Sequence, residues 1–195
     1  MAACTRDVVI LGHSFIRRLR DFVKSSEVND NLRLSRCNFS VSFYARGGLT
    51  IDRLANSPEL ISFPSSKDIC FLQIGSNDLC DRTKSIGEIA TAIFSFANVL
   101  IVCGKTKKII IGQIFRRSPR VTDPLFNDRV ILLNIRLQSL CNDADNIHFW
   151  HHRGFWDSFS FLAADGVHLQ HPSVDARPMT KYLQSLKSAI LHFSR

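Results

Sequence analysis

Long apolar runs are missing from this sequence of 195 residues. A helix that spans a membrane needs about 20 apolar residues in succession. The longest apolar stretches here, such as Ile109–Ile111 followed by Ile114 and Phe115, have the length of a strand. The residues before the apolar segment Val8–Leu11 also lack the basic region and apolar core of a secretory signal. We therefore predict no transmembrane segment, no secretion signal and an intracellular, cytoplasmic location.

Paired cysteine motifs are missing as well. The six cysteines, at positions 4, 37, 70, 80, 103 and 141, form no Cys-x-x-Cys pair. This pattern predicts reduced thiols, as expected inside a cell. Cys70, Cys103 and Cys141 stand within apolar segments, so we expect them to be small buried side chains.

Signatures of cofactors and metals are also absent. The sequence has no Gly-x-x-x-x-Gly-Lys-Ser/Thr phosphate loop, and no dinucleotide fingerprint follows the first apolar segment. His148, His151, His152 and Asp157 are close in sequence. Adjacent residues on a strand point to opposite faces, and no further ligand follows at zinc spacing. We predict neither a cofactor nor a metal site.

The overall composition is that of a globular protein, with 45% hydrophobic and 22% charged residues. These proportions exclude a disordered chain, a collagen and a coiled coil. The formal net charge is +8. A basic balance favours anionic partners, such as nucleic acid, an acidic membrane surface or an anionic substrate, but it also fits an ordinary solvated surface. Charge alone leaves these alternatives open, and nothing in the sequence indicates an oligomeric state.

Short β-branched segments alternate with amphipathic ones along the whole chain. The strand-like segments are 7–11, 39–44, 69–74, 108–114 and 147–150. Apolar residues at spacings of three and four predict helices over 14–25, 85–103, 126–141 and 176–193. Long loops are expected at 31–37, 116–125 and 151–164, and Gly104 is expected to end the second helix. Strands joined by crossover helices predict an α/β protein, a three-layer α/β/α sandwich with a five-stranded parallel sheet, in one domain over 1–195.

Glycine and polar residues follow the predicted strands where their carboxyl ends meet. They are Gly12-His13-Ser14, Gly47-Gly48, Gly75-Ser76-Asn77-Asp78 and, in a loop after the fifth strand, Asp165-Gly166-Val167-His168. Ligands bind at this edge in open α/β sheets. Each group has an ordinary structural interpretation, such as a helix-capping serine or a turn glycine. Together they predict a nucleophile (Ser14), a base (His168), its orienting carboxylate (Asp165) and an oxyanion hole formed by Ser14, Gly48 and Asn77.

Four sequence blocks resemble those of the SGNH (GDSL-type) hydrolase superfamily. They are DVVILGHSFIRRL, ARGGLT, LQIGSNDL and DGVHL, which begin at Asp7, Ala45, Leu72 and Asp165. The resemblance implies a flavodoxin-like fold and ester hydrolysis, with the catalytic and oxyanion roles on the residues named above. If the second block matches the family's pattern with a shift of one residue, Gly47 takes the place of Gly48 as the oxyanion donor. The family's first block usually reads Gly-Asp-Ser, and His13 replaces the Asp, which puts the rigidity of the nucleophile loop in doubt.

Two further features bear on which substrate or partner such a site would bind. The segment 154–169 and the Arg-rich first helix resemble esterase-type domains encoded by some animal retroelements. Arg46, Arg116 and Arg117 lie at the same strand edge, where they are a candidate substrate rim. We expect a small-molecule or lipid ester as substrate. The alternative is a catalytically weak or inactive module whose basic rim binds nucleic acid or acidic lipid.

Aromatic residues crowd the segment before His168. They are Phe149, Trp150, Phe155, Trp156, Phe159 and Phe161. Most are expected in the core, and a minority are candidates for lining an acyl pocket. The segment 151–164 is therefore either a lid or part of the core.

Overall fold

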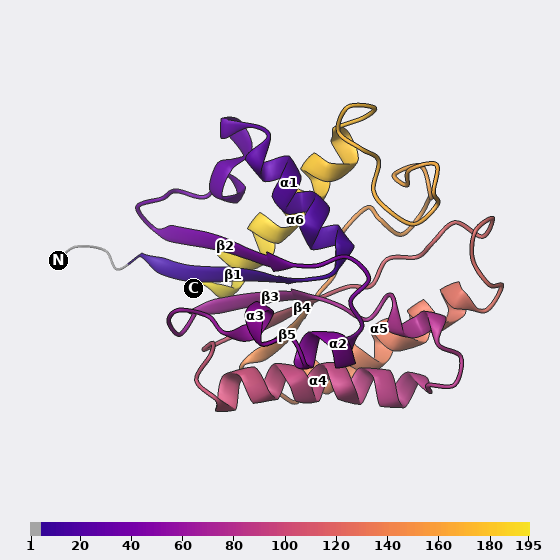
Figure 1. Cartoon of the computed structure of the whole chain (residues 1–195), viewed down its shortest axis with the longest axis horizontal. Coiled ribbons are helices and arrows are strands. Elements are labelled where there is room, and N and C mark those ends of the chain that lie inside the picture. The colour runs from indigo at the N-terminus through magenta and orange to yellow at the C-terminus, as the bar shows by residue number, and fades with distance from the viewer. Residues whose placement is uncertain (1–4) are drawn as a thin grey trace.

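A parallel sheet of five strands lies between two layers of helices in the computed structural model, which describes residues 5–195 (Figure 1). The strands are β1 (Arg6–Gly12), β2 (Phe39–Ala45), β3 (Ile69–Gln73), β4 (Ile109–Gly112) and β5 (Ile147–Trp150). Their spatial order is β2-β1-β3-β4-β5, and every pairing is parallel. This is the flavodoxin-like order, in which the chain direction across the sheet reverses between β1 and β3. The predicted α/β/α fold is confirmed.

The central strands are apolar on both faces because helices cover both faces. In β1, the residues from Val8 to Leu11 have no exposed surface. Val8 and Ile10 face the layer that contains α1 (Ser14–Lys24) and α6 (Arg177–Phe193). Val9 and Leu11 face the layer that contains α4 (Ile86–Val102) and α5 (Phe126–Asn142). Strands of a buried parallel sheet therefore read as continuous apolar runs.

The long helices match the predicted ones closely. A capping box formed by Ser85 and Glu88 starts α4, and Gly104, with φ of +68°, follows its end as expected. Cys103 is exposed, so its predicted burial is wrong. The buried stripe of α4 ends at Leu100, and Cys103 is the C-cap residue beyond it. Cys70 and Cys141 are buried, and every cysteine from Cys37 onward is a free thiol; Cys4 lies outside the described residues.

Several short elements were not predicted. They are α2 (Ile51–Ala55), α3 (Pro58–Ile61) and the 3₁₀ segments η1 (Glu27–Arg33) and η2 (Asp78–Cys80). The fourth strand also ends at Gly112 rather than at residue 114. Ile114 is still buried, but its N–H donates to the Asn134 side chain at 2.8 Å instead of to a strand. Its apolar character therefore reflects burial in the core outside the sheet.

No described helix has the length and apolarity that crossing a membrane requires. Within residues 5–195 there is also no group of three or more metal-ligating side chains.

Candidate active site

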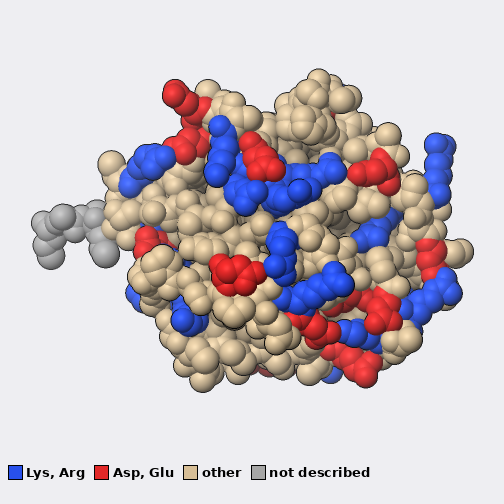
Figure 2. All heavy atoms as spheres, in the orientation of Figure 1, with Lys and Arg blue, Asp and Glu red and all other residues tan. Residues whose placement is uncertain are grey.

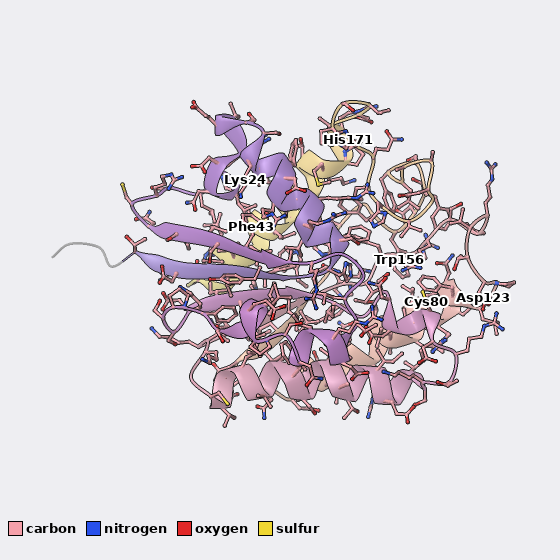
Figure 3. The ribbon with its side chains drawn as sticks, in the orientation of Figure 1. Lys24, Phe43, Cys80, Asp123, Trp156 and His171 are labelled. Atoms are coloured by element: carbon pink, nitrogen blue, oxygen red, sulfur yellow. The ribbon has the colours of Figure 1, made fainter. Side chains whose placement is uncertain are left out.

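The candidate site is a pocket of about 310 Å³ at the carboxyl ends of β1 and β3, where the strand order reverses. Its lining comes from segments that are far apart in the sequence: His13, Ser14, Phe15, Arg17, Gly47, Gly48, Ser76, Asn77, Arg117, Val167 and His168. Cys80 and Trp156 mark this end of the sheet in Figure 3. The structure thus brings together the four sequence blocks predicted to converge.

Ser14 stands at a sharp passage from β1 into α1. Gly12 is required there, because a Cβ atom at this position would lie 2.2 Å from the Gln73 carbonyl oxygen of β3. The N-cap residue of α1 is His13, whose Nδ1 accepts the Phe15 N–H at 3.4 Å. The interpretation of Ser14 as the N-cap is therefore wrong. Ser14 is the first helical residue, which leaves its own N–H without an intrahelical partner.

Ser14, His168 and Asp165 form a hydrogen-bonded chain. The Ser14 Oγ lies 2.9 Å from Nε2 of His168, and Nδ1 of His168 lies 2.8 Å from Oδ2 of Asp165. The other Asp165 oxygen accepts the backbone N–H groups of Val167 and His168, both at 2.9 Å. Both carboxylate oxygens are therefore engaged, and the imidazole is directed at the Ser14 hydroxyl.

The surroundings hold Asp165 ionised and His168 neutral. Partial burial alone would raise the pKa of Asp165, but the two backbone N–H groups and the His168 ring outweigh it and lower that pKa to about 2. Burial lowers the pKa of His168 below its usual value of 6.5. The hydrogen bond to Asp165 opposes this shift, while the cations of Arg18 and Arg117 add to it. A neutral imidazole can accept a proton at neutral pH, which a general base must do.

Two other segments that carry candidate hydrogen-bond donors line the same pocket as Ser14. Gly48 has a φ of +71°, a conformation that suits glycine, and a Cβ atom there would meet no atom within 4 Å. Gly47 also lines the pocket, so both glycines of the second block are within it. The Asn77 amide donates one N–H to the Leu49 carbonyl at 2.8 Å, which leaves a second N–H. The donors predicted for an oxyanion hole therefore surround one pocket.

His13, the residue that replaces the usual Asp, is almost fully buried. Burial, the Arg117 cation and His168 together lower its pKa to about 3, so the ring is neutral at pH 7. Its backbone N–H donates to the Gln73 carbonyl at 3.2 Å. The capping bond and this backbone bond hold the loop in front of Ser14 without a carboxylate.

The three arginines of the predicted rim have different surroundings. The Arg46 side chain pairs with Glu59 at 2.9 Å and with Ser57 at 2.8 Å. The Arg116 guanidinium stacks between Trp156 and Phe159, at 4.7 and 5.0 Å from their ring centres. Only Arg117 lines the pocket. Figure 2 shows other Lys and Arg side chains gathered over α1 and between α1 and α2.

The aromatic residues before His168 lie outside the pocket. Phe155 and Phe161 are buried in the core beneath α6, which anchors segment 151–164 there. His152 is buried as well, with its ring atoms 2.8 Å from Ser185 Oγ and 3.2 Å from Gln73 Oε1. His148 stacks on Phe193. The apolar lining of the candidate site comes instead from Phe15 and Val167.

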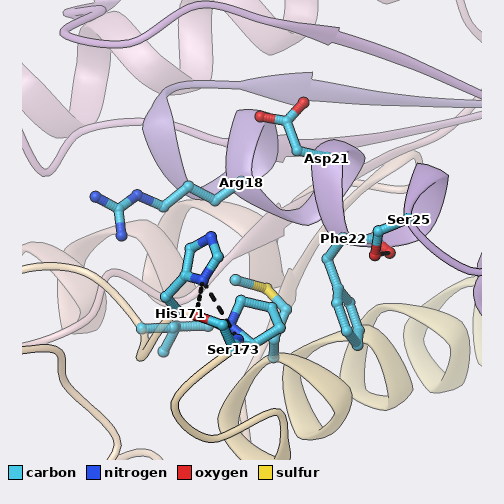
Figure 4. Close-up of a pocket in the computed structure, with 9 residues that line it drawn as sticks. Arg18, Asp21, Phe22, Ser25, His171 and Ser173 are labelled. Atoms are coloured by element: carbon cyan, nitrogen blue, oxygen red, sulfur yellow. Dashed lines mark hydrogen bonds between the residues drawn. The ribbon is translucent and has the colours of Figure 1, made fainter.

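A second cavity of about 430 Å³ lies on the other side of α1 (Figure 4). Arg18, Phe22 and Leu169 are among its lining residues, and His171 bonds to Ser173 on its opposite wall. Arg18 links this cavity to the site, because its guanidinium lies 3.6 Å from the Asp165 carboxylate. Sequence reasoning did not place Arg18 beside Asp165, although its position one helical turn after Ser14 is compatible with that contact.

No family model and no curated protein matches the sequence. Solved structures do match. Axe2, an acetylxylan esterase from Geobacillus stearothermophilus, has a TM-score of 0.64 at 14% identity, over 95% of this chain and 94% of that one. LAE5, an alpha/beta hydrolase enzyme from the metagenome of Lake Arreo, has a TM-score of 0.65 at 15% identity, over 94% of this chain and 95% of that one. At these identities the likeness shows the fold, which is the one expected from the resemblance to SGNH hydrolases. The likeness to retroelement-encoded domains stays a prediction.

Proposed function

We propose that this chain is a serine esterase that cleaves carboxylic esters through an acyl-enzyme on Ser14. The observation that carries the proposal is the hydrogen-bonded chain from Ser14 Oγ to His168 and on to Asp165, at 2.9 and 2.8 Å, inside a pocket lined with hydrogen-bond donors. These are the groups, and the geometry, that activate a serine hydroxyl.

The reaction would proceed in two halves. Ser14 Oγ attacks the ester carbonyl carbon while His168 Nε2 takes the hydroxyl proton, and Asp165 stabilises the imidazolium. The Ser14 and Gly48 N–H groups and the Asn77 amide hold the tetrahedral oxyanion. The C–O bond to the alcohol then breaks, and His168 returns its proton to the leaving oxygen. Water, deprotonated by His168, then attacks the acyl carbon, the bond from that carbon to Ser14 Oγ breaks, and His168 returns the proton to Oγ as the carboxylic acid leaves.

The substrate class that fits is a small ester or the ester group of a larger lipid. The pocket, with a volume of about 310 Å³, has room for a short acyl group. Structural neighbours that are esterases support this class by fold. The binding-module hypothesis has less support, because Arg46 and Arg116 are engaged within the chain and the triad is intact in its geometry.

The test compares wild type with Ser14→Ala on p-nitrophenyl acetate, butyrate and octanoate, with fluorophosphonate labelling measured by intact mass. We expect turnover and a single adduct in the wild type, and neither in Ser14→Ala. The control is Ser25→Ala, at the other end of the same helix, where the hydroxyl only bonds to the Phe22 carbonyl. It should keep both turnover and labelling. A folded wild type without turnover or adduct would refute the esterase proposal and favour the binding module.

A further inference from the structure

The Arg117 side chain enters the candidate site from beyond the end of β4 and reaches the segment that carries Asn77. Its Nη2 donates to the Ser76 carbonyl at 3.1 Å, to Ser76 Oγ at 3.0 Å and to Asn77 Oδ1 at 3.3 Å. Its Nη1 lies 3.2 Å from Cys80 Sγ. The guanidinium is therefore bound across the 76–80 segment, where it forms part of the pocket lining.

The start of α5 holds Arg117 in this position. The Asn127 side chain bonds to both backbone groups of Arg117, accepting its N–H at 3.0 Å and donating to its carbonyl at 2.9 Å. The Phe126 ring lies 4.5 Å beneath the guanidinium carbon. A side chain that is fixed at its backbone and stacked along its length keeps its charge in one place.

The neighbours of Asn77 determine how its amide is oriented. A guanidinium has only donors, so the atom of Asn77 that faces Arg117 must be Oδ1. The Leu49 carbonyl can only accept, so the atom that faces it must be Nδ2. The two contacts agree, and they leave one N–H of Nδ2 for a ligand in the pocket.

We propose that Arg117 is a positioning residue for ester hydrolysis: it orients and polarises the Asn77 amide so that its free N–H stabilises the oxyanion. The inference rests on the proposed function and assigns Arg117 a role that differs from a substrate rim. A donor that is already oriented needs no reorganisation when charge develops on the carbonyl oxygen. A cation bound to the amide oxygen makes the amide N–H a stronger donor.

The Arg117 charge also acts on the base. The charged and titratable groups around His168 are Asp165 on its own loop, Arg18 on α1, His13 before α1 and Arg117. Arg17 of α1 also lines the same pocket. The Arg117 cation lowers the pKa of His168. Its removal raises that pKa, so the acid limb of kcat/KM should move to higher pH.

The experiment compares Arg117→Met and Arg117→Lys with wild type on p-nitrophenyl butyrate across pH. We expect kcat to fall on the order of 10–10²-fold in Arg117→Met, less than the roughly 10²–10³-fold typical of losing a whole donor, with little change in KM. Its acid limb should move to higher pH. Arg117→Lys should keep the acid limb near the wild-type position, because the positive charge stays. Its kcat should still fall, because one ammonium group cannot reproduce the contacts that the two guanidinium nitrogens make with Cys80 and Asn77.

Arg129 supplies a matched control. Its guanidinium also ties the same segment to α5, through the carbonyls of Leu79, Asp81 and Lys84 at 2.7–3.1 Å, but it does not contact Ser76 or Asn77. Arg129→Met should lower the melting temperature without moving the acid limb. If Arg129→Met reproduces both effects of Arg117→Met, Arg117 is only a structural tether and the inference is wrong.

A double-mutant cycle tests whether Arg117 acts through Asn77. Once Asn77→Ala has removed the amide, Arg117→Met should lower kcat much less than it does in the wild type. Additive losses, or full kcat in Arg117→Met, would overturn the inference while leaving the esterase intact. A wild type with no turnover and no fluorophosphonate adduct would remove the proposed function itself, and this inference with it.

Discussion

Replacing Asp78 tests how the two segments that carry the proposed oxyanion donors are held together. Asp78 is 1% exposed as a residue, and its two carboxylate oxygens accept the Ile51 N–H at 3.0 and 3.2 Å. Ile51 begins α2 just after Gly48, whereas Asp78 follows Asn77 directly. This bond therefore links the segment of one predicted donor to the segment of the other.

The expected loss in Asp78→Ala follows from what the substitution leaves behind. An unpaired buried N–H costs about 1–3 kcal/mol. Burial raises the pKa of Asp78, which means that the ionised carboxylate is itself disfavoured in the folded state. Removing this carboxylate offsets part of the cost of the unpaired N–H, so we expect the free energy of unfolding to fall by about 1–2 kcal/mol. For a chain of this size that lowers the melting temperature by roughly 2–8 °C.

The assay is thermal and urea unfolding of wild type, Asp78→Ala and Asp81→Ala. Asp81 is exposed, belongs to the same segment and bonds only to Thr83 through its side chain. Asp81→Ala changes the net charge by the same amount as Asp78→Ala, and it should lower the free energy of unfolding by less than about 1 kcal/mol. Turnover should fall in Asp78→Ala alone, since both donor segments loosen. Equal melting temperatures for the two variants would refute the reasoning.

Two further outcomes follow from the structure. Gly12→Ala should unfold at much lower urea concentration than wild type, because its Cβ would lie 2.2 Å from the Gln73 oxygen; an unchanged midpoint would contradict the requirement for glycine. Burial lowers the pKa of His152 from 6.5 to about 3. As the pH drops from 6.5 toward 3, the unfolded chain therefore binds a proton at His152 that the folded chain does not bind. The free energy of unfolding should fall over this window. His152→Gln should show a shallower fall over this window, and an identical slope would exclude His152 as the cause.

The main architecture could be predicted because each long element carries a repeated signal. Continuous apolar runs mark strands buried on both faces, and spacings of three and four mark α4, α5 and α6. The short helices α2 and α3 escaped, because five and four residues are too few to show a period. They are set by contacts, such as the Ile51 N–H to Asp78, that bring together residues 27 positions apart.

The candidate site could be predicted in its location but not in its supporting contacts. The rule that ligands bind at the carboxyl edge of an open α/β sheet is enough to predict that Ser14, Asn77 and His168 lie in one place. The directions of the arginine side chains followed no such rule. Arg116 and Arg117 are neighbours in sequence, yet one stacks on Trp156 and the other reaches Asn77. That difference depends on which face of the chain meets α5, which a sequence pattern does not record.

The hydrogen bond between Ser14 and His168 joins residues 154 positions apart. During translation Ser14 therefore leaves the ribosome long before His168, the residue that would activate it. During synthesis the Ser14 hydroxyl is an ordinary alcohol, and it meets its proposed base only after β5 and the loop before α6 have been made. Reactivity toward a fluorophosphonate would thus report completion of the whole sheet, and a nascent chain would be protected from acylating itself on compounds it meets early.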